Sequence, residues 1–475
     1  MESNLLEGKL YKGKYFKAED VEKILSGACD ILSSIGVRVV NERALKKLEE
    51  LGFEIKAGRV VINQKQTRSF LTDIRARLTR QEVPEIQKGK STFDGMVSIY
   101  SYNYERPEDG QILPFDTSAL TSMAQFVEKC SQRYGFGTGV PGYPCDVPPA
   151  LESLIKYKIA AENCHDGWPL EPTSMLAAKY MFEMAEIMEK PMRRLPVFIA
   201  SPLCLGGDSF DIVFEYKEKL ESVYVFSMPT LGVTTPLSVS MAFAMDLAEV
   251  LGGALLVHEL TGLPVDIKPN VFPFDLRAFN IGFGSPEKFI FECMSADFSA
   301  QLLQTPLEYR STNIHTWAKK AGIQAAVEKG TLMMAGAMNG ARKFYSIGTL
   351  SLDEVFSPIQ LILDLEIMQH VAKLIKGFEV EELPENFTSI IKEGLERGFI
   401  SSDLTLDCHE DYIWYSKLFE RTSFNKWANS SKKDVTEIIR EEVKKINQQD
   451  VKYILDAQKA RALNEIYKLA MGKTI

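Results

Sequence analysis

Tyrosines alternate along residues 100–104, which read Tyr-Ser-Tyr-Asn-Tyr. In an extended strand, side chains two apart point to the same face, so Tyr100 and Tyr102 would lie on one side. Two such rings can line a pocket for a cation, because the π face of an aromatic ring attracts positive charge. Tyrosines also pack well in a hairpin for reasons of strand propensity alone. The sequence leaves both interpretations open.

His315 and Trp317 form a second pair of this kind, since they are two residues apart after a predicted strand. His315 is equally well interpreted as a histidine of the core or of a loop. The five histidines and seven cysteines form no HxH, HExxH or CxxC motif. We therefore predict no metal site, and reduced thiols in place of disulfides.

The remaining motifs do not indicate a particular reaction. Residues 137–142 fit the GxGxxG pattern, but Pro141 prevents the helix start that a dinucleotide site needs. The sequence has no P-loop, no GxSxG elbow and no kinase signature. A carboxylate pair of the glycosidase kind stays an open alternative, although no spacing favours it. We predict no catalytic side chain.

The composition is that of a globular protein: of 475 residues, 45% are hydrophobic and 25% charged. With 55 basic and 64 acidic residues the net charge is −9, which argues against nucleic-acid binding. The most apolar run, residues 241–257, contains Asp246 and Glu249 and predicts a buried helix and not a membrane span. The first residues lack the apolar core of a signal peptide, so we expect a cytoplasmic protein.

Short apolar runs alternate with helical patterns between residues 135 and 377. This alternation predicts parallel strands joined by helices, and the number of strands favours a closed (β/α)₈ TIM barrel. The predicted domains are an N-terminal helical segment (1–90), the barrel with a leading hairpin (91–380) and a C-terminal helical segment (381–475).

Some element boundaries are specific enough to be checked. We expect helices at 21–35, 44–51, 210–220, 237–251 and 357–377, and a further helix opened by the Ser cap and first-position Pro of Ser285-Pro286-Glu287. The expected strands are 59–62, 197–200, 223–226, 255–257, 265–267, 307–309 and 332–334, with a hairpin over 92–113.

One stretch resembles a known family. Residues 227–237 read Ser-Met-Pro-Thr-Leu-Gly-Val-Thr-Thr-Pro-Leu, and Ala-Glu-Val-Leu follows at 248–251. This resembles the signature of the trimethylamine methyltransferase family. Shorter matching motifs lie in the same order at 201–203, 275–277, 284–287, 335–337, 360–366 and 420–427. The resemblance implies a (β/α)₈ barrel that moves a methyl group from an amine to the cobalt of a separate corrinoid protein.

Two departures from the family pattern indicate a branch. The founding enzymes carry pyrrolysine, whereas this sequence contains only standard residues, and the loop at 312–319 differs from the family's Asp-containing version. The chain is similar to members without pyrrolysine, which demethylate quaternary amines such as glycine betaine. A quaternary nitrogen already carries the charge that its leaving group needs, so no general acid is required. A dry, aromatic-walled site favours the charge loss in this reaction.

Within this resemblance, loop position suggests the substrate-binding residues Tyr100, Tyr102, Asn103, His315, Trp317, Tyr345 and Phe356. The aromatic rings would hold the N-methyl groups, and His315 or Asn103 would bind a substrate carboxylate. No tightly bound cofactor is expected, because the methyl acceptor is the cobalamin of the partner.

The corrinoid is expected on a separate protein. Residues 407–412 begin like the DxHxxG loop of cobalamin-carrying modules, but Tyr412 stands where that loop has Gly. The resemblance also implies a homo-oligomer. Two rival functions stay open: another barrel enzyme such as a hydrolase or lyase, which would use a metal or a lysine Schiff base, and a non-catalytic betaine-binding protein. The sequence does not choose among the possible quaternary amines.

Overall fold

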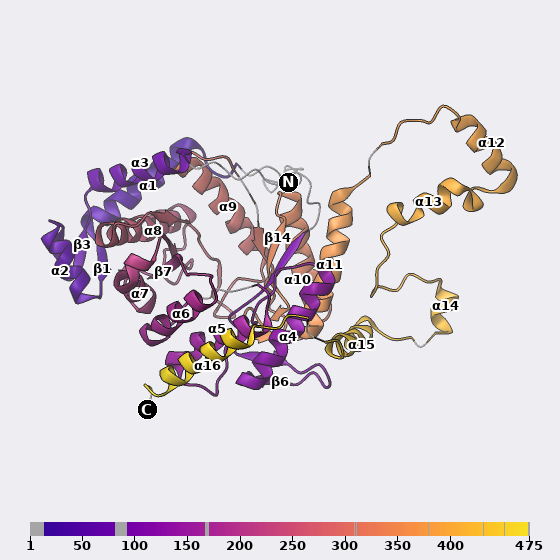
Figure 1. The fold of residues 1–475 in the computed structure, drawn as a ribbon. Coiled ribbons are helices and arrows are strands. Elements are labelled where there is room, and N and C mark those ends of the chain that lie inside the picture. The colour runs from indigo at the N-terminus through magenta and orange to yellow at the C-terminus, as the bar shows by residue number, and fades with distance from the viewer. Residues whose placement is uncertain are drawn as a thin grey trace.

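The computed structural model describes residues 14–80, 93–166, 171–307, 309, 311–378, 380–430, 432–450 and 452–473. It is a mixed α/β protein in which helices surround several short sheets (Figure 1). Most of the buried apolar side chains join one continuous core.

The N-terminal part contains three helices and three strands. The elements are α1 (Ala18–Ser34), β1 (Val37–Val39), α2 (Glu42–Glu50), β2 (Glu54–Lys56), β3 (Arg59–Val61) and α3 (Gln64–Arg80). The helices expected at 21–35 and 44–51 and the strand at 59–62 are confirmed. Gly36 ends α1 with a φ of +74°, and a Cβ there would lie 2.5 Å from the carbonyl oxygen of Val60. The segment is thus not purely helical, because β1 pairs with both β3 and β8 (Cys204–Leu205).

Three parallel strands form one end of the largest sheet. They are β7 (Arg194–Ala200), β9 (Ser222–Ser227) and β10 (Val265–Ile267), in the order β10-β9-β7. Between them the chain forms α7 (Asp208–Tyr216), the 3₁₀ turn η2 (Lys217–Lys219) and α8 (Val239–Thr261). This is the strand–helix alternation that the sequence predicts.

A second parallel group joins distant parts of the chain. Strand β14 (Lys343–Ile347) lies between β13 (Ser311–Asn313) and β4 (Asp94–Val97). An isolated parallel bridge joins Met96 of β4 to Gly137 and so extends this group by one segment. Helix α9 (Pro286–Leu303) precedes β13, α10 (Ile323–Met338) lies between β13 and β14, and α11 (Pro358–Lys376) comes after β14. Hydrogen-bonded ladders do not join the two groups into one ring among the described residues.

The expected hairpin is shorter than residues 92–113. It consists of β5 (Asn103–Glu105) and β6 (Ile112–Pro114), which pair antiparallel, whereas β4 pairs with β14. A four-stranded sheet forms when β16 (Val355–Phe356) adds to β5 and β15 (Thr349–Leu350) to β16. A small separate ribbon contains β11 (Phe274–Asp275) and β12 (Asn280–Ile281).

Helices make up the rest of the described chain. They are α4 (Thr117–Tyr134), η1 (Pro149–Leu151), α5 (Glu152–Asn163), α6 (Met175–Ile187), α12 (Phe387–Arg397), η3 (Phe399–Ser401), α13 (Asp403–Tyr412), α14 (Phe424–Ala428), α15 (Val435–Asn447) and α16 (Ala457–Met471). Helices α12, α13 and α14 extend away from the body, whereas α15 and α16 pack against it (Figure 1).

Three predicted strands are wrong. Residues 255–257 lie in α8 and residues 332–334 in α10, because a short apolar run looks the same in a buried helix as in a buried strand. The strand expected at 307–309 begins later, as β13. The helix after Pro286 is confirmed, but the Ser285 hydroxyl donates to the carbonyl of Gly282 and does not cap the helix.

Helix α8 is buried on nearly all sides, as the run at 241–257 predicts. By length and apolar composition it would also pass as a membrane span. However, 78% of its most apolar window is buried inside the protein, as in a core helix. The helix is longer than expected and ends at Gly262, which has a left-handed conformation.

The GxGxxG pattern has a packing role in this fold. Gly142 bridges to Ser101 in a parallel pairing, and a Cβ at Gly142 would lie 2.1 Å from the Ser101 carbonyl oxygen and 2.8 Å from the Phe115 ring. The glycine therefore allows two backbone segments to approach closely.

We expect Gly142→Ala to lower the free energy of unfolding by roughly 2–4 kcal/mol, because the added methyl group overlaps backbone. Gly330→Ala in α10 is the matched control, since a Cβ there meets only Ile367 at an ordinary 3.6 Å. The control should be neutral or stabilising by up to ~1 kcal/mol. Equal urea midpoints for the two variants would contradict this packing role.

Candidate substrate-binding site

An aromatic cavity of about 510 Å³ lies beside β7. Its wall contains the rings of Tyr100, Tyr102, Tyr143 and Phe198. The Tyr102 and Tyr143 rings stack with their centroids 5.7 Å apart and an angle of 27° between their planes. Tyr100 and Tyr102 are 48% and 51% exposed, so ring surface is open to a ligand. The two tyrosines that the sequence singles out thus face one cavity.

Carboxylates supply the charge of this cavity. Glu152 and Glu171 line it, and the described lining residues include no lysine or arginine. Glu171 accepts a hydrogen bond of 2.9 Å from the Tyr224 hydroxyl on β9. Burial, together with the nearby Glu171, raises the pKa of both Tyr100 and Tyr224. The phenols therefore stay neutral at physiological pH, and the cavity has the electrostatics of a cation site.

One lysine lies behind the wall. The Lys156 ammonium is 3.7 Å from the centroid of the Tyr143 ring and donates to the carbonyl of Ile99. Burial holds the pKa of Lys156 well below its usual range, although Glu171 and Glu152 act in the opposite direction. Loss of its proton would reduce its repulsion of a cation in the cavity.

A chain of aromatic rings leads from this cavity to His315. Centroid distances are 6.3 Å from Phe198 to Phe226, 6.3 Å from Phe226 to Phe272, 5.5 Å from Phe272 to Phe283 and 4.8 Å from Phe283 to His315. Phe198 and Phe226 come from paired positions of neighbouring strands. The chain of rings therefore runs across the strands, over the same side of the sheet.

His315 is held in place by polar partners. Its Nε2 lies 3.1 Å from Asp353 Oδ1 and 2.9 Å from Ser346 Oγ, and Asp353 also accepts from Ser98 at 2.8 Å. Burial opposes ionisation of Asp353, but His315 and Ser98 outweigh it and lower the pKa of this carboxyl. The Nε2 atom of His315 therefore has its hydrogen-bond partners, while Nδ1 of the same ring is buried without a partner among the described residues.

The other predicted site residues lie elsewhere. Asn103 donates to the Glu354 carbonyl across the β5–β16 pair at 3.3 Å, and Phe356 is fully buried in the core. The Trp317 amide donates to Glu328 at 2.9 Å, outside the lining of either described cavity. Tyr345 lines a different, polar cavity.

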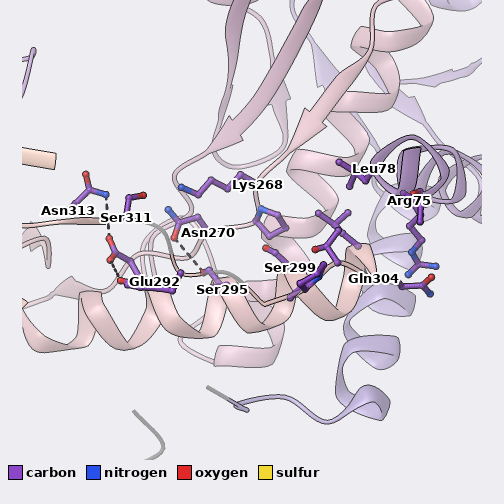
Figure 2. A pocket seen from close by; sticks show the side chains of 18 of the residues that line it. Arg75, Leu78, Lys268, Asn270, Glu292, Ser295, Ser299, Gln304, Ser311 and Asn313 are labelled. Atoms are coloured by element: carbon purple, nitrogen blue, oxygen red, sulfur yellow. Dashed lines mark hydrogen bonds between the residues drawn. The ribbon is translucent and has the colours of Figure 1, made fainter. Parts of the chain in front are cut away.

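This polar cavity, of about 740 Å³, lies between α3, α9, β13 and the residues after β10. Lys268, Asn270, Ser311 and Asn313 gather at one end, and Arg75, Leu78 and Gln304 lie at the other (Figure 2). The Lys268 side chain is exposed to the cavity that it lines. Burial lowers the pKa of Lys268, although the nearby Glu292 partly offsets this.

Two buried carboxylates of α8 fix the ends of the central strands. Glu249 accepts from Ser201 Oγ at 2.6 Å and from the Leu203 amide at 2.9 Å, after β7. Asp246 accepts from Ser227 Oγ at 2.8 Å, at the end of β9, and from the Asn270 amide at 2.7 Å, after β10. These bonds fix the segments next to both cavities.

Most of the cavity was not found from the sequence. Tyr143, Phe198, Glu171 and Tyr224 follow no motif. For Phe198, the alternation along β7 is the one signal that could have identified it. In the described part of the chain, no group of three or more His, Cys, Asp or Glu side chains is placed to hold a metal ion.

Comparison with known proteins decides the family. The family model described as trimethylamine methyltransferase (MTTB) matches residues 173–469. The chain belongs to the trimethylamine methyltransferase family. The match includes the signature residues 227–237 and 248–251, and Glu249 of this signature holds the segment after β7.

Relatives within the family are named for different activities. Trimethylamine methyltransferase MttB of Methanosarcina barkeri is 28% identical over 273 residues, which are 57% of this chain and 54% of that protein. Glycine betaine methyltransferase of Desulfitobacterium hafniense is 24% identical over 427 residues, 86% of this chain and 87% of that protein. The chain spans about half the length of the trimethylamine methyltransferases that it matches.

Among solved structures, the monomethylamine methyltransferase of Methanosarcina barkeri aligns with 97% of this chain and 89% of its own. The sequence identity is 11% and the TM-score 0.43.

We expect Glu249→Ala to destabilise the protein by roughly 2–4 kcal/mol, because two buried donors lose their acceptor. Glu259→Ala, at an exposed position of the same helix, is the control and should stay within about 0.5 kcal/mol. Urea unfolding of both variants measures the difference. A loss in the control as large as that in Glu249→Ala would show that the strand-end bonds are not responsible.

Proposed function

We propose that the chain transfers a methyl group from a quaternary amine, glycine betaine or a related betaine, to Co(I) of a separate corrinoid protein. The aromatic cavity carries this proposal. The rings of Tyr100, Tyr102, Tyr143 and Phe198 suit N-methyl groups, at about 0.5–2 kcal/mol per ring. Glu152 and Glu171 complement the permanent charge of the nitrogen. Similarity to a glycine betaine methyltransferase along most of both chains supports the same substrate class.

The reaction places few demands on side chains. The electron pair of Co(I) forms the new bond to the methyl carbon, and the pair of the breaking C–N bond stays on nitrogen. A neutral tertiary amine leaves, so no proton is transferred. The cavity contributes by holding the methyl group in line with cobalt and by excluding water, which would stabilise the separated charges of the reactants.

We further propose that the strands form a closed (β/α)₈ barrel, with the cavity at its mouth. The parallel pairing of β14 with β4 supports closure, because it makes the last strand of the series a neighbour of the first. The parallel order β7-β9-β10 provides the opposite side. In this arrangement the corrinoid protein docks over the carboxyl ends of the strands. We also propose that the protein is a homo-oligomer and that it is cytoplasmic.

One observation favours a different enzyme, a lyase that forms an imine. Lys268 lies just after a strand, in a polar cavity, and burial lowers its pKa. Such a lysine can attack a carbonyl carbon with loss of water. If this were its function, borohydride would trap a carbonyl substrate on Lys268, and the adduct would be found by mass spectrometry. We expect no adduct with pyruvate or simple aldehydes at millimolar concentration.

The cavity assignment predicts the effect of removing rings. Tyr100→Ala and Phe198→Ala should each lower kcat/KM for glycine betaine by about 10- to 100-fold, through lost cation–π contact and positioning. The measurement is the rate of methyl-Co(III) formation, followed by absorbance with the reduced corrinoid protein. Tyr415→Ala is the control, since Tyr415 is exposed and far from the lining residues in sequence and contact. Unchanged rates in both ring variants would show that the substrate binds elsewhere.

A further inference from the structure

We propose that Lys268 binds the carboxylate of the substrate, so that the chain selects zwitterionic betaines over quaternary amines with no acid group. This subsite rests on the proposed function and makes its substrate class more specific. The carboxylate partners expected from the sequence, His315 and Asn103, line neither described cavity. His315 Nε2 is held by Asp353 and Ser346, and Asn103 donates to the Glu354 carbonyl. A cationic group is therefore sought elsewhere in the same interior.

The strand register directs Lys268 toward the aromatic side of the sheet. Phe198 pairs with Phe226, and Tyr224 with Asp266, so these side chains point to one face. Lys268 follows Asp266 by two residues and continues on this face, next to Phe226. Since neighbouring strands lie about 4.8 Å apart, the backbone of Lys268 is roughly 10 Å from that of Phe198. The flexible four-carbon side chain can shorten this separation.

Lys268 is free to bind an anion. It has no hydrogen bond or ion pair among the described residues. The nearby acid, Glu292, is already satisfied: it pairs with Lys288 at 2.6 Å and accepts from Thr312 at 2.7 Å and from the Tyr309 hydroxyl at 2.8 Å. Glu292 therefore does not compete strongly for the Lys268 ammonium.

Polar groups suitable for a carboxylate lie around Lys268. Asn270, Ser311 and Asn313 line the same end of the cavity as Lys268 (Figure 2). The Asn313 amide also donates to Glu292 at 3.4 Å, which leaves its second N–H for a ligand. A carboxylate has two oxygens and needs several donors, which an ammonium together with amide and hydroxyl groups provides. The aromatic cavity and the polar cavity share no lining residue, so the subsite requires that they communicate across the face that carries Phe226. A zwitterion would then bind with its ammonium in the acidic aromatic cavity and its carboxylate at Lys268.

The charge of Lys268 links this subsite to pH. Because burial lowers the pKa of Lys268, the free protein loses the ammonium at a lower pH than an exposed lysine would. The group is cationic below its pKa and neutral above it. Glu292 and Lys288 are the charged groups that face it, and they act on it in opposite directions. Binding of a betaine should therefore weaken as the pH rises toward that pKa, while binding of a cation without a carboxylate should not.

The test compares glycine betaine with choline, which has the same trimethylammonium group but a hydroxyl in place of the acid. With the full chain and the reduced corrinoid protein, kcat/KM should favour glycine betaine by at least about tenfold. Lys268→Met should remove this preference through a higher KM for glycine betaine, and Lys268→Arg should retain part of it. Lys320→Met, at an exposed position, is the matched control. Calorimetric titration of glycine betaine into each variant gives binding without the partner.

The outcomes separate the two proposals. If the wild-type chain transfers methyl from quaternary amines but Lys268→Met keeps the full preference and affinity for glycine betaine, the subsite is overturned and the proposed function stands. A wild-type preference for choline would also overturn it. If the wild-type chain transfers methyl from no quaternary amine, the proposed function fails and the subsite with it.

Discussion

The arrangement of the strand ends next to both cavities depends on two carboxylates that are buried in one apolar helix. Helix α8 packs on nearly all sides, and its Asp246 and Glu249 carry no ion pair among the described residues. Glu249 accepts hydrogen bonds from the residues after β7, and Asp246 accepts them from the end of β9 and from the Asn270 amide after β10. Burial raises the pKa of both carboxyl groups, so they are held as hydrogen-bonding groups more than as charges. The ends of three strands are thereby fixed relative to one helix. Phe198 lies on β7 and Phe226 on β9, and Lys268 directly follows β10.

The fixed strand ends explain how the site can promote the proposed reaction without transferring a proton. A permanently charged nitrogen can leave as a neutral amine without receiving a proton. The site then has to position the substrate and keep water away from it. The rings beside β7 and the carboxylates Glu152 and Glu171 suit the charge before the reaction. In the proposed reaction the rings hold the methyl group in position, and fewer waters remain to stabilise the separated charges of the reactants.

The sequence predicts the order of strands and helices well, because periodicity is a local property. It fails where the same local pattern has two outcomes: residues 255–257 and 332–334 are apolar in a helix or a strand alike. The site is less predictable. Tyr100 and Tyr102 were found because they alternate, whereas Tyr143 and Glu171 reach the cavity only through the fold. Phe356 is the converse case, since its loop position suggested a pocket but its ring fills the core. The signature at 227–237 and 248–251 indicates the family, but only the structure shows that its Glu249 holds the segment after β7.

The central claim is that the permanent charge of the methyl donor replaces a catalytic acid. Glycine betaine and its demethylated product, dimethylglycine, test this most directly, because they share the carboxylate and differ by one methyl group and that charge. With the chain and reduced corrinoid protein, glycine betaine should yield the methyl-Co(III) spectrum, and dimethylglycine should not. Methyl transfer from dimethylglycine or trimethylamine, with none from glycine betaine, would contradict the account.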